Sequence, residues 1–258
     1  MIPTSIQRFL LAGFCAVAGV PTALRADQAA DIARIHTEAI GGRERMESLV
    51  SMRITGTVVV GAKRVKFTMI AARPDRVRLE TENNGRTLVS ATDGVEPPWE
   101  FDTGTWPPAY RVMSESAARA FTADTEFDDP LVAGPERGFA LDYGGEAMVE
   151  GKKLLRVLVT RKLTETFSLL VDPETYFIVM RVETRPAAGG GTRQIITRYD
   201  DFRPVDGVLL PHRVTLEADG HTQQTMIMER IETNTEVTPE MFTRPKTAAG
   251  DGKPPGGM

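Results

Sequence analysis

The sequence predicts a mainly β protein (α+β), in which a curved antiparallel sheet of about 11–12 strands wraps over two helical segments. Three observations support this fold class. Short runs that alternate apolar and polar residues fill most of the chain, as expected for strands with one buried face. Tight-turn pairs such as Asp206-Gly207 and Asp219-Gly220 separate many of these runs. Two stretches show helical periodicity instead, one near the start and one in the middle.

Residues 1–26 have the pattern of a secretory signal peptide. Arg8 precedes an apolar run from Phe9 to Val20, and small residues follow up to Ala26. We therefore expect export to the periplasm and cleavage after Ala26. Two alternatives stay open, namely a retained membrane anchor and lipidation at Cys15, where the preceding residues differ from a lipobox by one extra Phe.

Composition limits the classes of function. Cys15 is the only cysteine among 258 residues, so the mature chain has no thiol for a disulfide, a thiolate metal site or cysteine catalysis. Loss of Arg8 and Arg25 with the signal changes the formal charge from −4 to −6. Since a mildly acidic chain of pI about 5.6 has no basic footprint, we expect no nucleic-acid partner.

Residues 27–50 begin the mature domain as a helix. Ile32, Ile35, His36 and Ile40 recur at helical spacing on one stripe, and Gly41-Gly42 is a helix stop. A histidine on such a stripe is more often a buried side chain with satisfied hydrogen bonds than a ligand, and we interpret His36 in that way.

A first group of strands follows, covering residues 51–60 and then a meander from 63 to 101. The proline pairs at 97–98 and 107–108 are expected to prevent regular ladder pairing between them. A helical insert then spans 114–126 with Ser114 as its N-cap. Its inward residues are expected to be Met113, Ala117, Ala120 and Phe121.

A second group of strands fills the rest of one domain, residues 27–246. The expected strands are 138–149, 152–162, 164–172, 176–185, 192–202, 207–218 and 221–233. Residues 247–258 are rich in Gly and Pro, which predicts a disordered tail.

Several motifs occur in an order found in a known superfamily. They are Arg73-Pro74, the Asp93-Gly94 turn followed by Trp99 and Phe101, the hairpin from Tyr199 through Val205-Asp206-Gly207-Val208 to Leu210-Pro211, and the closing Phe242 and Pro245. With the order of helices and strands, they resemble the LolA/LolB-like periplasmic lipoprotein carriers, or outer membrane lipoprotein-sorting proteins. The resemblance covers nearly the whole mature chain. It implies a half-barrel capped by helices, and a cavity between sheet and lid that takes up acyl chains.

The resemblance also implies a role for Arg73. In the carriers, the arginine of the Arg-Pro pair bonds to the lid in the closed form, and here the lid would be built from residues 104–135. Arg73 could equally be a solvent-exposed residue at a strand end. Its fork of donors suits the latch role.

The alternating patterns and the resemblance together suggest which apolar side chains line the cavity. Met and Phe suit variable acyl chains because they are large, and Met is also flexible. The candidates are Phe67, Met69, Val77, Leu79, Trp99, Phe101, Phe121, Phe167, Leu169, Leu210, Met226 and Met228. For many of these, ordinary core packing is the competing interpretation.

No motif points to catalysis or to a metal. The sequence has no Gly-x-Ser-x-Gly, and its three histidines have no metal-ligand spacing. We expect no cofactor and no enzymatic activity, and give a secreted hydrolase little weight. The densest acidic set could hold a divalent cation, although a solvated loop is the simpler interpretation. Its members are Asp124, Glu126, Asp128 and Asp129.

Two function hypotheses follow. The first is a periplasmic, non-enzymatic carrier that shelters a lipid or lipoprotein acyl chain during transfer between envelope membranes. Its partners would include an inner-membrane transporter or an outer-membrane receptor. The second is a regulatory or interaction module of the same fold that senses envelope lipids or docks to a membrane complex. Residues 106–110, with their Trp, Pro and Tyr, are its candidate docking surface.

Overall fold

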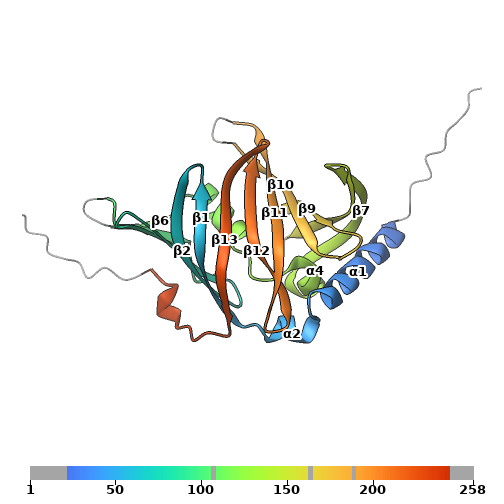
Figure 1. Ribbon diagram of the computed structural model, residues 1–258, viewed down its shortest axis with the longest axis horizontal. Coiled ribbons are helices and arrows are strands. Elements are labelled where there is room, and N and C mark those ends of the chain that lie inside the picture. The colour runs from blue at the N-terminus through green and yellow to red at the C-terminus, as the bar shows by residue number, and fades with distance from the viewer. Residues whose placement is uncertain (1–21, 106–108, 162–164, 188–189, 245–258) are drawn as a thin grey trace, which may run out of the picture.

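A computed structural model of the chain describes residues 22–105, 109–161, 165–187 and 190–244 (Figure 1). Within these ranges, 13 strands form one antiparallel sheet in the order β6-β5-β4-β3-β2-β1-β13-β12-β11-β10-β9-β8-β7. The two ends of the sheet, β6 and β7, do not pair, so the sheet is an open half-barrel rather than a closed barrel. The predicted fold class is confirmed.

The elements alternate two groups of strands with helices. The helices are α1 (Thr22–Ala39), α2 (Arg43–Ser48), α3 (Glu115–Asp124), α4 (Pro130–Ala133), η1 (Gly134–Arg137) and η2 (Pro239–Met241). The first strands are β1 (Ser51–Val60), β2 (Lys63–Ala72), β3 (Arg76–Asn83), β4 (Arg86–Thr92), β5 (Trp99–Asp102) and β6 (Ala109–Val112). The later strands are β7 (Phe139–Val149), β8 (Lys152–Arg161), β9 (Glu165–Val171), β10 (Ile178–Pro186), β11 (Thr192–Val205), β12 (Val208–Ala218) and β13 (His221–Thr233).

Tight hairpins connect most neighbouring strands, as their Gly-containing pairs predict. Asp206 and Gly207 have φ of 47° and 80°, and Asp219 and Gly220 have 50° and 78°. Two successive residues with positive φ make the turn whose twist matches that of paired strands. These turns fix the register of β11, β12 and β13.

One expectation about the sheet is wrong. The proline pairs do not prevent pairing, because β5, which follows the first pair, forms a hairpin with β6, which follows the second, with four residues paired on each strand. Pro98 immediately precedes β5, so its missing N–H is not needed in the ladder, while its carbonyl accepts from the N–H of Met113 at 2.8 Å. This hairpin brings the sheet to 13 strands.

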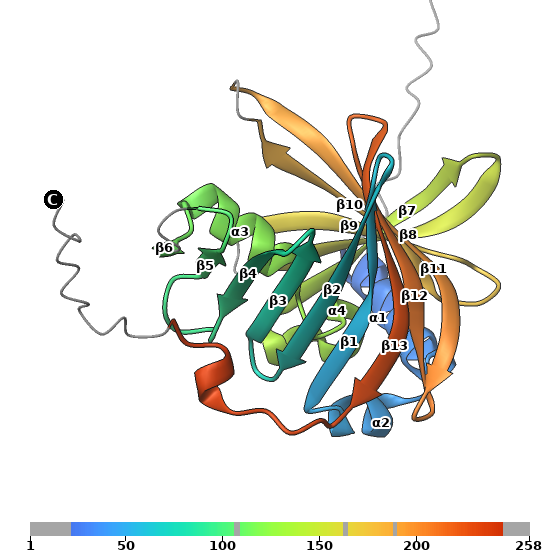
Figure 2. The ribbon, with the colours of Figure 1, turned by 60° about the vertical axis from the view of Figure 1, so that its left-hand side comes forward.

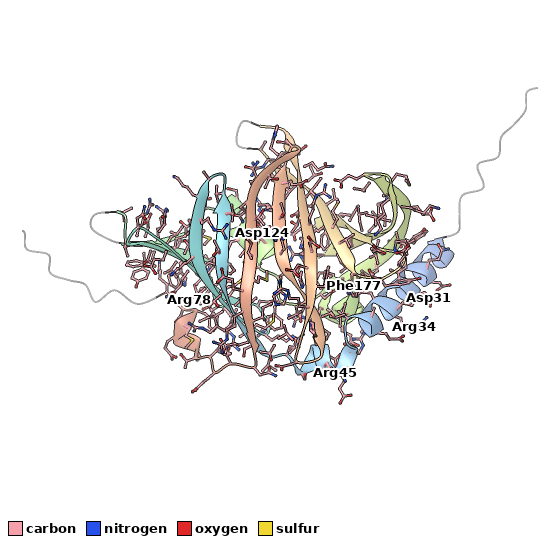
Figure 3. All side chains as sticks on the ribbon, in the orientation of Figure 1. Asp31, Arg34, Arg45, Arg78, Asp124 and Phe177 are labelled. Carbon is pink, nitrogen blue, oxygen red and sulfur yellow. The ribbon has the colours of Figure 1, made fainter. Side chains whose placement is uncertain are left out.

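Helices α1 and α4 cover the inner side of the curved sheet. Ala29, Ile32 and Ala33 of α1 are buried against side chains of β7, β8 and β9. Asp31 and Arg34, labelled in Figure 3, lie on the outer face of α1 and pair at 3.4 Å. Figure 2 shows α1 and α4 behind β1, β2 and β13, on the inner side of the curve.

The segment after β13, residues 234–244, crosses the outer side of the sheet. Phe242 is fully buried, and its carbonyl accepts from the Trp99 indole at 2.8 Å. Arg78, which lies beside this segment in Figure 3, donates to the carbonyl of Met241 at 3.0 Å. The segment therefore covers β3 and β5 from outside.

The predicted processing and tail segments fall largely outside the described residues. Residues 1–21 of the predicted signal peptide and the tail at 247–258 belong to that remainder, and the boundary at Ala26 stays a prediction. Among the helices that are described, none is both long and apolar enough to cross a membrane.

Candidate functional site

A cavity of about 390 Å³ lies between the inner face of the sheet and the helical insert. Side chains from both groups of strands line it, together with α1, α2, α3 and the segment after α3. Its size falls in the range of small-molecule sites. The sheet is strongly twisted and curves around the cavity (Figure 2).

Five methionines form part of the apolar lining. The five are Met46, Met52, Met69, Met226 and Met228. They come from α2, β1, β2 and β13, and four of them pack in one cluster around Ile54 and Phe67. Thioether side chains are flexible and polarisable, so this wall can adapt to different apolar ligands.

The structure brings seven of the twelve predicted cavity residues to this lining. They are Met69, Leu79, Phe121, Leu169, Leu210, Met226 and Met228. Phe121 comes from α3, which Ser114 caps as predicted by accepting from the N–H of Ala117. Ala117 itself is exposed, so the expected inward face of this helix is wrong at that position.

Trp99 and Phe101 lie on the other face of the sheet. In the register, Trp99 stands opposite Ala91, and Ala91 stands opposite Arg78, which faces outward. Both aromatic rings pack with Val89 and Tyr110, and the Phe101 and Tyr110 rings stack at 4.5 Å. The prediction that they line the cavity was wrong. An irregular loop precedes β5, so the alternation of the preceding strands does not determine which face of the sheet the β5 side chains occupy.

Phe67, Val77 and Phe167 share a face with cavity residues but lie outside the cavity. Each is 3–4% exposed and belongs to the packed core. Phe67 packs against Ile54 and Val58. The Arg181 guanidinium lies over the ring of Phe167, 4.0 Å from the ring centre. For these three residues the core-packing interpretation is the correct one.

Sequence reasoning missed several lining residues. Met52, Ile54, Val214 and Leu216 were available from strand alternation, since they continue the parity of neighbouring apolar residues. Met46 and Ile40 come from helices whose packing side the pattern alone does not fix relative to the sheet.

The segment that follows α3 ties the insert to the rest of the fold through its carboxylates. We call residues 124–129 the acidic link. Asp128 is 9% exposed and accepts from Arg73 Nε at 2.8 Å. Its second oxygen lies 2.8 Å from Arg137. Arg73 also donates to the carbonyls of Glu47 at 2.9 Å and Met46 at 3.2 Å, at the end of α2.

The first half of the acidic link is anchored to the second group of strands. Glu126 lies 2.8 Å from Arg161 and 3.5 Å from Arg181, and is 16% exposed. Asp124, labelled behind the central strands in Figure 3, pairs with Arg185 at 2.5 Å. Burial lowers the pKa of Arg185, but its hydrogen bond to Asp124 and the nearby carboxylates outweigh this and raise it.

His36 anchors the end of the link. Its Nε2 lies 3.0 Å from Asp129 Oδ2, and its Nδ1 lies 2.7 Å from the carbonyl oxygen of Tyr176. Burial lowers the pKa of His36, yet the Asp129 charge and these hydrogen bonds outweigh it, and the pKa is raised above the ordinary value. The expectation that His36 is a buried side chain with satisfied hydrogen bonds describes this geometry.

The acidic set is therefore not a solvated loop. All four carboxylates have a basic partner on another element, which corrects that interpretation. Among the described residues, no group of three or more His, Cys, Asp or Glu side chains is placed to hold a metal ion.

The other two histidines lie apart from this arrangement. His212 Nδ1 is 3.1 Å from the Leu210 carbonyl, and His221 is exposed at a hairpin. Within the described ranges, Asp129 is the one side chain that hydrogen-bonds a histidine ring. Of the docking surface suggested for residues 106–110, the first three lie outside the described residues, and Tyr110 packs on Phe101.

Comparison with known proteins places the fold. No protein-family model and no curated protein matches the sequence. A crystal structure described as an outer membrane lipoprotein-sorting protein domain from Vibrio parahaemolyticus has 8% identity and a TM-score of 0.54, covering 84% of this chain and 97% of its own. A DUF1329 family protein from Desulfovibrio piger has 10% identity and a TM-score of 0.55, covering 85% and 97%. The resemblance to lipoprotein-sorting proteins is confirmed as a likeness of fold.

Proposed function

We propose that this protein is a periplasmic, non-enzymatic carrier that shelters the acyl chain of a lipid or lipoprotein in its cavity. The observation that carries the proposal is the largely apolar cavity, with five methionines in its lining, under an insert whose connecting segment is anchored by ion pairs. An acyl chain needs no catalytic group to bind. Burial of about a dozen methylenes contributes on the order of 10 kcal/mol before ordering costs are subtracted.

In this proposal the insert moves when a chain enters, and Arg73 is our candidate for the residue that latches it. Its guanidinium joins Asp128 of the acidic link to the last carbonyls of α2. The contact is to the link and α2 rather than to α3, so the latch would hold the base of the insert. Loss of the Arg73 contacts would free the link from this side of the cavity.

Transfer between membranes implies export and partners. The proposed periplasmic location follows from the signal-like residues 1–26, and the amino terminus of the exported protein should be Asp27 when sequenced. An inner-membrane transporter or an outer-membrane receptor would deliver or accept the chain. If N-terminal sequencing finds Met1 retained, the location must be revised.

The test is native mass spectrometry of protein purified from the periplasm, with lipid extraction of the same sample. We expect a co-purifying acyl lipid, or uptake of a fluorescent fatty-acyl probe by the delipidated protein. Met69→Trp should fill the cavity and weaken probe binding at least tenfold. Met148→Trp is the matched control, because Met148 is 67% exposed on β7. A protein that carries no lipid and takes up no probe would refute the carrier and favour the sensing or docking module.

A further inference from the structure

One row of the cavity wall, which we call the polar row, carries three polar side chains among its four residues. The register places Arg181 opposite Thr197, Thr197 opposite Leu216, and Leu216 opposite Gln224, across β10, β11, β12 and β13. All four side chains line the cavity. On β13 the lining changes from Gln224 to Met226 and Met228 within four residues, so the cavity has a polar side and an apolar side.

Arg181 is buried and already balanced. It is 6% exposed and lies within 3.6 Å of carboxylate oxygens of both Glu126 and Glu183. A ligand with a negative head would bring a third anion to this guanidinium. An uncharged head avoids that repulsion. Arg181 also donates from Nη1 to the carbonyl oxygen of Ala123 at 3.2 Å, so its position at the cavity wall is fixed.

The cavity volume matches one acyl chain of moderate length better than two. A methylene group occupies roughly the 30 Å³ that a water molecule takes in the liquid. A cavity of about 390 Å³ therefore holds one chain of roughly a dozen such groups. A lipid with two chains of that length exceeds it about twofold.

From the polar row and the volume, we infer that the ligand is a single-chain amphiphile with an uncharged, hydrogen-bonding head, such as a monoacyl ester or amide. Its head lies at Arg181, Thr197 and Gln224, and its chain extends along Met226 and Met228. This inference rests on the proposed acyl-chain carrier and specifies its ligand class.

The number of chains is tested with a series of monoacylglycerols of about 8 to 16 carbons, by isothermal titration with the delipidated mature protein. Affinity should rise about fourfold per methylene and level off near 12–14 carbons. The diacylglycerol of the best chain length, and the fatty-acid anion of the same length, should each bind at least tenfold more weakly. Equal or tighter binding of the two-chain lipid or of the anion would overturn the inference.

The position of the head is tested with Thr197→Val, which removes one hydroxyl and keeps the shape. The expected loss for the best monoacylglycerol is about fivefold, the value of one hydrogen bond. Thr215→Val is the matched control, because Thr215 lies on β12 outside the cavity and its hydroxyl is 3.3 Å from that of Thr225. Gln224→Met provides a second variant should Thr197→Val fail to fold. An equal effect of the cavity and control variants would refute the polar site.

The two proposals fail in different ways. If none of the acyl compounds binds, the carrier function itself is wrong. If two-chain lipids bind best, or if the polar-row variants behave as the control does, the carrier stands and only the ligand class is wrong.

Discussion

His36 offers the sharpest test of how the insert is held, because both of its ring nitrogens face acceptors. A carbonyl oxygen lies 2.7 Å from Nδ1, and the Asp129 carboxylate lies 3.0 Å from Nε2. A neutral imidazole carries only one N–H and can satisfy one of them, whereas the imidazolium satisfies both. The charged ring is therefore the form that best joins α1 to the acidic link.

Replacement of His36 by Leu would leave the Asp129 carboxylate without its basic partner. Removing one member of a buried pair costs 3–5 kcal/mol in other proteins. Since Asp129 is 20% exposed and can gain water, we expect about 3 kcal/mol, at the low end. For a domain of this size, that corresponds to a fall of about 6–12 °C in melting temperature.

The pH dependence has a definite sign. The pKa of His36 in the folded protein is raised above its ordinary value of 6.5. Its contribution is therefore complete below that value and is lost as the pH rises through the folded-state pKa. The pKa of Asp129 is lowered, because the His36 charge and the hydrogen bonds outweigh the effect of burial. Asp129 thus stays charged across the same window.

Thermal unfolding measured from about pH 6 to pH 9 checks this reasoning. The wild-type protein should lose stability across the range, and the His36→Leu variant should lose less. His221→Gln is the control for removal of a histidine, because His221 is exposed, and it should follow the wild type. If the variant at position 36 keeps the wild-type pH dependence, the imidazolium is not what holds the link.

Three further changes probe the latch, the sheet and the C-terminal segment. Arg73→Leu should speed release of a bound acyl probe at least tenfold in stopped-flow measurements, and unchanged release would remove Arg73 as the latch. Gly56→Ala places a Cβ 2.0 Å from the Ile227 carbonyl oxygen in the centre of the sheet and should cost about 3 kcal/mol in urea unfolding. Phe242→Ala empties a fully buried site and should cost about 3–5 kcal/mol, with a red shift of tryptophan emission as a local readout, because water gains access to Trp99.

The strands and their hairpins could be predicted because their signals are local. Alternation decides which residues form strands, and Asp-Gly pairs decide where two of them turn. The expected range 221–233 coincides with β13, and the expected range 152–162 coincides with β8 over 152–161, the part that the structure describes. The β5–β6 hairpin was missed because proline was given too much weight, although a proline just before a strand removes no ladder bond.

The residues that line the cavity could be predicted only in part. The face of the sheet on which a side chain lies depends on how its strand pairs with strands that are distant in the sequence. Met226 and Leu79 follow the parity of long uninterrupted runs, and both line the cavity. Trp99 follows an irregular loop, and the face of the sheet on which its side chain lies follows only from its pairing with Ala91. Alternation determines which residues of one strand share a face, but it does not determine which residues of the next strand share that face when an irregular loop connects the two strands.

The acidic link shows a different limit. Asp128 pairs with a residue 55 positions away, and Asp129 with one 93 positions away. No local pattern contains those partners, so the carboxylates resembled a solvated loop. Because one short segment holds contacts to α1, the β2–β3 turn and the later strands, lifting the insert must break several of them together.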